Sequence, residues 1–123
     1  MAVQRGWFYL ADLNPRQGTE PGKTRPVLIV QTDLLNQVGH PSSLIIPVTT
    51  NIQDDATPLR VRIKAGSPGF FVDSDLMIDQ LRAIDNRRLY KLNSNELLKT
   101  IAPANAGLMS EVEDCIKKVL DLA

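Results

Sequence analysis

The chain has 123 residues, enough for one compact domain whose core needs neither disulfides nor a metal. Its 14 basic side chains balance its 14 acidic ones, so a nucleic-acid site must come from a local cluster of charge and not from a net positive field. The single cysteine, Cys115, excludes an internal disulfide, and no apolar run approaches the roughly 20 residues of a membrane helix. We therefore expect a cytoplasmic protein that has no membrane segment.

The first half of the chain predicts short strands joined by loops that are rich in Gly and Pro. Trp7–Leu13 is aromatic and alternating, Pro26–Gln31 is a short apolar run, and Ser43–Thr50 is rich in β-branched residues. Pro47 predicts that the third strand is an edge strand or carries a bulge, because proline cannot donate a ladder hydrogen bond. The polar segment Gly18–Thr24 is a long loop, and such loops are often functional.

Further short strands are expected in the next part of the chain. Leu59–Lys64 alternates strictly and predicts a strand with one basic face. Phe71–Val72 and Leu76–Ile78 are each expected to start a short strand, and Gln80–Ile84 continues after Asp79.

The C-terminal part changes to a helical period. Ser94 is a candidate N-cap for a helix through Leu97, Leu98 and Ile101, which Pro103 would interrupt. A final helix is predicted because six apolar residues recur at spacings of three and four: Leu108, Val112, Cys115, Ile116, Val119 and Leu120. Strands followed by helices indicate an α+β or barrel-plus-helix domain. We expect a single domain over residues 1–123, with the barrel at about 3–92 and a helical segment at about 94–122.

Four blocks of the sequence form a pattern when they are taken together. Arg5–Pro15 joins Arg-Gly to an aromatic strand and Asp-Leu-Asn-Pro, and Gly18–Val30 joins a glycine-rich loop to an Arg-Pro-Val-Leu strand. Ile46–Thr50 ends a strand in two threonines, and Asp79–Asp85 reads Asp-Gln-Leu-Arg-Ala-Ile-Asp. In order and separation these blocks, which cover most of residues 5–92, resemble the MazF/PemK family of toxins. Each block alone is weak, but the set is specific.

The resemblance implies a mainly β fold with a C-terminal helix, a small SH3-like β-barrel of the CcdB/MazF/PemK type that forms a homodimer. It implies the toxin of a type II toxin–antitoxin system. Such a toxin is a metal-independent, sequence-specific endoribonuclease (an mRNA interferase) that uses no cofactor and cleaves single-stranded RNA but not DNA. The RNA would lie in a groove at the dimer interface, and a cognate antitoxin would cover this groove while the toxin is silent.

Metal-independent cleavage of RNA uses the neighbouring 2′-hydroxyl as the nucleophile, so the site must move protons and stabilise the extra phosphorane charge. Arg25 is a predicted catalytic residue because its guanidinium can hold two phosphoryl oxygens with a fixed positive charge. Thr49 is the second, because a hydroxyl at a strand end can donate to a phosphoryl oxygen or orient the 2′-hydroxyl. Thr50 points to the opposite strand face and would support the site or be structural. The sequence offers no obvious general base.

Other residues are predicted to contact the RNA. Asp79 and Gln80 could read bases or order Arg25, and the polar and charged residues of the first long loop could clamp the strand. The predicted RNA-binding residues are Arg16, Thr19, Glu20, Lys23, Thr50, Asp79 and Gln80. Each also has an ordinary interpretation as a solvated loop residue, a cross-strand hydrogen bond or a dimer contact.

Several conspicuous residues are not assigned to the site. The basic face of Arg60, Arg62 and Lys64 is a conceivable RNA track, but short alternating strands usually expose a charged face anyway. His40 is interpreted as a surface residue and Cys115 as core. No cluster of ligand residues predicts a metal site.

Two alternatives to the nuclease stay open. One is a CcdB-like toxin, which has the same fold but binds a DNA topoisomerase, and the other is a catalytically inactive SH3-like binding module. Some family members use a histidine in the first loop and an arginine near the Asp-Gln motif, and the matching positions here are Thr19 and Met77. Arg25 together with Thr49 argues for the nuclease, because a pure binder needs neither.

Overall fold

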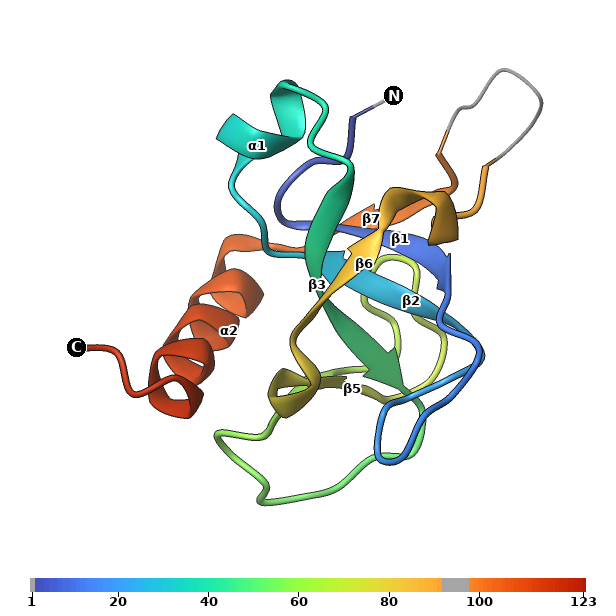
Figure 1. Ribbon diagram of the computed structural model, residues 1–123. Helices are drawn as coiled ribbons and strands as arrows, with labels where there is room; N and C mark the ends of the chain where they lie inside the picture. The colour runs from blue at the N-terminus through green and yellow to red at the C-terminus, as the bar shows by residue number, and fades with distance from the viewer. Residues whose placement is uncertain (1, 92–97) are drawn as a thin grey trace.

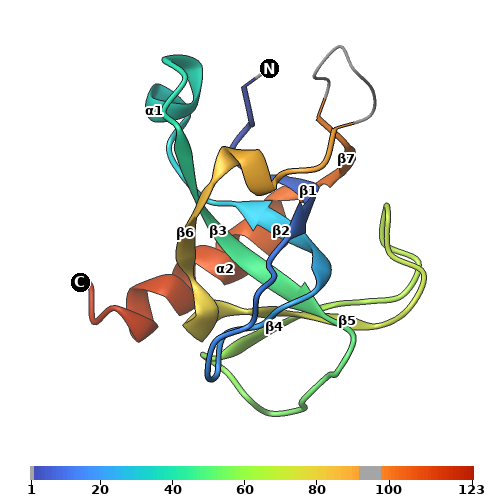
Figure 2. The same ribbon diagram turned by 45° about the vertical axis from the view of Figure 1, so that its right-hand side comes forward.

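A curled antiparallel sheet with a C-terminal helix across one face makes up the fold (Figures 1 and 2). The computed structural model describes residues 2–91 and 98–123. Its strands are β1 (Trp7–Asp12), β2 (Thr24–Ile29), β3 (Ser42–Thr49), β4 (Arg60–Ile63), β5 (Ser74–Met77), β6 (Arg82–Asp85) and β7 (Thr100–Pro103). The α-helices are α1 (Asp33–Gln37) and α2 (Ala106–Val119), and the 3-10 turns are η1 (Ile78–Gln80) and η2 (Asn86–Arg88). The predicted mainly β fold with a C-terminal helix is confirmed.

Strand β3 is the centre of the sheet. The strand order is β4-β5-β3-β2-β1-β7, and β6 pairs with β3 as well. On the side away from β2, β6 pairs with Ser42 to Ile45, and β5 then pairs with Val48 and Thr49. Pro47 lies between these two pairings, where neither strand is opposite it. The expectation of an edge strand was therefore wrong: proline is tolerated here because a central strand changes partner at this point.

Both faces of the central strands are buried, which explains why β2 reads as a continuous apolar run. Phe8, Leu28 and Ile46 belong to one core cluster, which includes Val112 and Cys115 of α2. Their neighbours in sequence, among them Tyr9, Val27, Ile29 and Ile45, belong to a second cluster on the other face. Core residues thus pack on both faces of the sheet, so a functional site is expected in the loops at its ends.

The final helix is confirmed, and its sequence explains its bounds. The Asn105 side chain accepts a hydrogen bond from the Leu108 N–H at 2.8 Å and so caps the first turn. Val112 and Cys115 are buried, as the apolar stripe predicted, whereas Leu120 is half exposed at the C-cap. Lys117 and Lys118 lie in the last turn, where positive charge is favourable to the helix dipole.

The helix predicted from Ser94 to Ile101 was wrong where the structure describes it. Residues 94–97 lie outside the described residues, and Thr100–Pro103 forms β7, which pairs with β1 across a register shift between Phe8 and Tyr9. Strand pairing with a distant partner overrides the local helical spacing here.

One predicted strand start also failed. Phe71 is exposed in a turn, and the strand that follows it, β5, begins at Ser74. Among the residues that the structure describes, no helix has the length and apolar character to cross a membrane.

Candidate functional site

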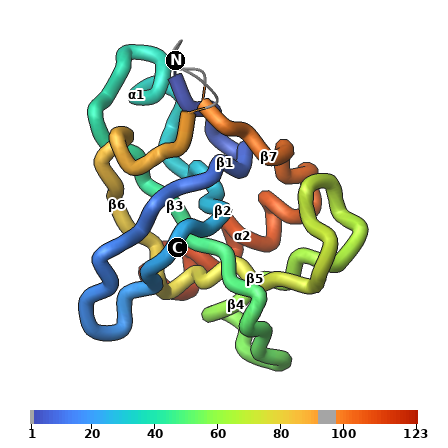
Figure 3. Tube along the Cα trace, turned by 90° about the vertical axis from the view of Figure 1, so that its right-hand side faces the viewer, coloured from blue at the N-terminus to red at the C-terminus, as the bar shows by residue number. Residues whose placement is uncertain are grey.

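A cleft of about 590 Å³ lies between the β1–β2 loop and the loop after β3. Both loops lie at the end of the molecule opposite α1 (Figure 3). The walls of the cleft come from these two loops, the start of β2, the start of β4 and the corner between β5 and η1. Eight of the nine residues predicted from the sequence line it: Arg16, Thr19, Glu20, Lys23, Arg25, Thr49, Asp79 and Gln80. Thr50 does not line the cleft, and its side chain is exposed elsewhere. Segments that are far apart in the sequence therefore converge on one surface.

Arg25 is held in the cleft by backbone carbonyls and by no carboxylate that the structure describes. Its Nε donates to the Gly22 oxygen at 2.6 Å and its Nη1 to the Val48 oxygen at 3.3 Å. Partial burial lowers the pKa of Arg25, and the nearby positive charge of Arg16 lowers it further. The guanidinium nevertheless stays protonated near neutral pH. The cleft thus contains an oriented cation that no carboxylate of the described residues neutralises and that can therefore bind an anion.

Thr49 is the last residue of β3 and is almost fully buried. Its Oγ1 accepts a hydrogen bond from the Asn51 N–H at 3.1 Å. Because the oxygen accepts from the backbone, the hydroxyl proton remains available to donate into the cleft. The guanidinium of Arg25 meanwhile contacts the carbonyl of Val48, the residue before Thr49, and both predicted catalytic residues line the cleft. Thr50 faces away because side chains alternate along a strand.

The β1–β2 loop is shaped by close packing. A Cβ on Gly22 would lie 2.8 Å from the Arg16 Cβ, so only glycine fits where the loop folds on itself. Lys23, with φ of 68°, adopts the left-handed conformation and donates its N–H to the Asn14 side chain at 2.8 Å. Glu20 forms a long ion pair of 3.8 Å with Arg82, which belongs to the Asp-Gln motif block. The loop is thereby tied both to itself and to the first residue of β6.

Sequence reasoning missed several residues of the cleft: Asn14, Pro21, Gly22, Asn51, Gln53, Leu59, Arg60 and Met77. Asn51 and Gln53 lie in a polar loop, which by itself carries no signal for a site. Arg60 is one of the three basic residues that were considered as an RNA-binding strand face. It lines the cleft, whereas the other two, Arg62 and Lys64, do not. No group of three His, Cys, Asp or Glu side chains within residues 2–91 and 98–123 is arranged to hold a metal ion.

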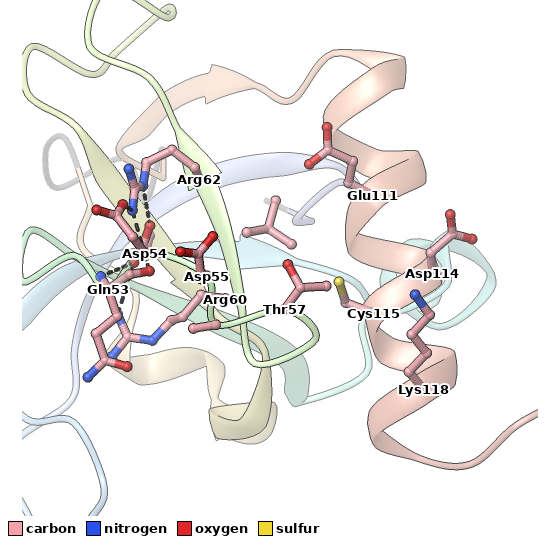
Figure 4. Close-up of a pocket in the computed structure, with 13 residues that line it drawn as sticks. Gln53, Asp54, Asp55, Thr57, Arg60, Arg62, Glu111, Asp114, Cys115 and Lys118 are labelled. Carbon is pink, nitrogen blue, oxygen red and sulfur yellow. Dashed lines mark hydrogen bonds and ion pairs between the residues drawn. The ribbon is translucent and has the colours of Figure 1, made fainter.

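Beside the cleft, a buried carboxylate joins two arginines. The side chain of Asp75 is only 1% exposed, and its Oδ1 accepts from Arg62 Nε at 2.6 Å (Figure 4). Its Oδ2 accepts from Arg60 Nη1 at 3.2 Å and from the Gln53 N–H at 2.8 Å. Burial alone would raise the pKa of Asp75, but the hydrogen bonds from Arg62 and Gln53 outweigh burial and lower the pKa below its usual value. We call Asp75, Arg60 and Arg62 the ion triad.

We expect Asp75→Asn to lower the free energy of unfolding at neutral pH by about 3 kcal/mol, because it leaves two guanidinium groups without their shared anion. Since the carboxyl has a lower pKa folded than unfolded, its stabilisation is complete above the ordinary value of 3.8 and is lost as the pH falls below it. Denaturant unfolding measured from about pH 7 to about pH 3 should show this acid-induced loss in the wild type and a weaker loss in the variant. Asp121→Asn, at the exposed C-terminal end, is the matched control. Identical acid sensitivity of wild type and Asp75→Asn would contradict the role of this carboxyl.

Comparisons with known proteins show the family of the chain. A model of the family described as PemK-like, MazF-like toxin of type II toxin-antitoxin system matches residues 4–120. The chain is 42% identical over 89 residues to endoribonuclease EndoA of Bacillus subtilis, covering 72% of this chain and 76% of that protein. It is 37% identical over 87 residues to endoribonuclease MazF of Staphylococcus epidermidis, covering 71% of this chain and 72% of the relative.

A solved structure shares the fold over the whole length. The crystal structure of MazF from Deinococcus radiodurans superposes with a TM-score of 0.76 at 23% identity, covering 99% of each chain. This likeness confirms the expected MazF-type architecture of a curled sheet and a C-terminal helix. The family match covers nearly all of the chain, and the chain belongs to the PemK-like, MazF-like toxins of type II toxin–antitoxin systems.

Proposed function

We propose that this toxin is an endoribonuclease that cleaves single-stranded RNA at specific sequences, without a metal, by attack of the 2′-hydroxyl on the adjacent phosphate. The observation that carries the proposal is the convergence of Arg25 and Thr49 at the end of β3, in a cleft that four distant segments build. Two relatives that are 37% and 42% identical are named endoribonucleases, which supports the same reaction class.

Arg25 stabilises the charge that develops on the phosphorane. Its Nε and Nη1 are held by carbonyls at fixed positions, so the group is oriented before substrate arrives. A preorganised cation of this kind acts most strongly where charge increases between the ground state and the transition state. A guanidinium is a poor acid or base at neutral pH, so its role is electrostatic.

Thr49 positions the reacting groups. Its hydroxyl oxygen accepts the Asn51 N–H, which fixes the rotamer, and its proton is directed to a phosphoryl oxygen or to the 2′-hydroxyl. Glu20 and Asp79 line the cleft. Their carboxylates accept hydrogen bonds from donor groups on RNA bases or sugars in this proposal. Because the nucleophile is the 2′-hydroxyl of the substrate, DNA, which lacks this group, is not cleaved.

The toxin acts as a homodimer in the cytoplasm, and its cognate antitoxin silences it by covering the cleft. The family description supports the antitoxin partner. Leu34 and Val38 at α1 are strongly exposed, at 77% and 78%, and such apolar surface supports a protein–protein contact.

The test is incubation of the purified protein with single-stranded RNA in excess EDTA. We expect cleavage at defined sites, with a 2′,3′-cyclic phosphate on one product and a 5′-hydroxyl on the other, because the 2′-oxygen displaces the 5′-oxygen. A polynucleotide kinase labels 5′-hydroxyl ends directly, so the cut sites can be mapped.

Thr49→Val and Thr50→Val form a matched pair in the same assay, since both remove a hydroxyl while keeping the β-branched shape. We expect Thr49→Val to slow cleavage strongly and Thr50→Val to have a small effect. Cleavage only when Mg²⁺ is restored would overturn the metal-independent mechanism. Intact RNA under all conditions would leave the CcdB-like toxin or the inactive binding module.

A further inference from the structure

The loop that follows Thr49 is held in one shape by the ion triad. The Gln53 N–H donates to Asp75 Oδ2 at 2.8 Å, and Arg62 Nη2 donates to the Gln53 oxygen at 3.4 Å (Figure 4). Arg60 Nη1 donates to the Asn51 oxygen at 3.1 Å. The Asn51 N–H also donates to Thr49. The backbone N–H and C=O groups of both Asn51 and Gln53 therefore all have hydrogen-bond partners. Side chains of two other strands therefore fix this backbone.

The side chains on this loop are, by contrast, unengaged. Asn51 and Gln53 are exposed, both line the cleft, and neither amide makes a hydrogen bond to any residue that the structure describes. In Figure 4 the Gln53 amide extends away from α2. The structural amides of the protein behave differently: those of Gln31 and Asn36 are buried and bond to each other and to the backbone. A rigid backbone that presents two free amides to a cleft is the arrangement of a recognition element.

We propose that Asn51 and Gln53 are base-reading residues of this toxin, and that Asp75 is the positioning residue that holds them through the ion triad. This inference rests on the proposed function and names part of its sequence specificity. An amide offers two donors and an acceptor that can match the Watson–Crick edge of an unstacked base. Because the backbone is fixed before binding, little conformational entropy is lost when a base is bound.

The position of the two amides decides which bases they read. Asn51 and Gln53 are two and four residues beyond Thr49, so their backbones lie within about 7 and 14 Å of it even if the chain were fully extended. They consequently contact nucleotides within a few positions of the scissile phosphate, not distant ones.

The experiment is cleavage of a randomised RNA pool, with the cut sites found by sequencing the 5′-hydroxyl ends. Wild type, Asn51→Ala and Gln53→Ala are compared, and Gln37→Ala on α1 is the matched control, an exposed amide far from the cleft. We expect each cleft variant to lose about 5- to 150-fold of discrimination at one nucleotide position near the cut, the range of one good base contact. Gln37→Ala should retain the wild-type preference at every position.

Asp75→Asn tests the positioning role. At a temperature where the variant is folded, we expect it to discriminate less between bases at the nucleotide position that Gln53→Ala affects. If Asp75 served only the stability of the fold, the variant would instead cleave all RNA sequences more slowly by the same factor. A folded Asp75→Asn protein with unchanged preference would overturn the positioning role.

The failures of the two proposals are distinguishable. If wild type cuts the pool and both amide variants keep its preference, the base-reading role is overturned and the nuclease stands. If wild type leaves the pool intact, the proposed function fails and the base-reading role falls with it.

Discussion

Arg25→Ala is expected to lower the rate of RNA cleavage by at least about a hundredfold, the effect of removing one preorganised transition-state donor. The structure gives the physical reason: the guanidinium is positioned by the carbonyls of Gly22 and Val48, and no carboxylate of the described chain neutralises it. Single-turnover rates at saturating RNA measure the effect on chemistry separately from binding.

Two variants sharpen this test. Arg25→Lys keeps the charge but loses the planar fork, so we expect activity between that of the wild type and that of the alanine variant. Arg87→Ala removes an exposed arginine that pairs with Asp85 outside the cleft, and it should cut RNA at the wild-type rate. Wild-type activity in a folded Arg25→Ala protein would remove Arg25 from the site and leave the cleft without its phosphate-binding cation.

The sequence indicated which residues would lie together where their place in a strand decides it. Arg25 precedes an apolar run and Thr49 ends another, so antiparallel pairing of β2 and β3 brings them to the same end of the sheet. The alternation of side chains also separated Thr49 from Thr50, and the structure shows the first in the cleft and the second outside it.

The fold was predicted less well where distant partners decide the local structure. The spacing of Leu98 and Ile101 fits a helix, but the exposed edge of β1 pairs with Thr100–Pro103 as β7. Pro47 in isolation indicates an edge strand or a bulge, and only the switch from β6 to β5 makes a central position acceptable. Both cases depend on contacts that no window of local sequence contains.

Asn51 and Gln53 were missed for a related reason. A polar loop of Asn, Gln and Asp looks like any solvated turn, and its order comes from a carboxylate more than twenty residues later. Arg60 and Arg62 were interpreted as part of one basic strand face, and Asp75 was not singled out, whereas in the structure two adjacent strands bring the three side chains together. Pairing of charges across β4 and β5 is thus the information that the sequence alone did not reveal.

An RNA substrate with a single 2′-deoxy nucleotide on the 5′ side of the cut should bind the toxin but resist cleavage altogether. The substitution removes the nucleophile itself and leaves the phosphate, the bases and the cleft unchanged, so its effect exceeds that of any one side chain. Competition against a labelled cleavable RNA measures binding, and gel analysis of the deoxy substrate measures cutting.

A second substrate, with the 2′-deoxy nucleotide moved one position away from the cut, is the matched control and should be cleaved at nearly the normal rate. This pair isolates the nucleophile, because both substrates lack one 2′-hydroxyl and differ only in which phosphate it could attack. If the first substrate is cut at the usual site, water must be the nucleophile. The cleft would then need a group that activates water, a task for which neither the guanidinium of Arg25 nor the hydroxyl of Thr49 is suited at neutral pH.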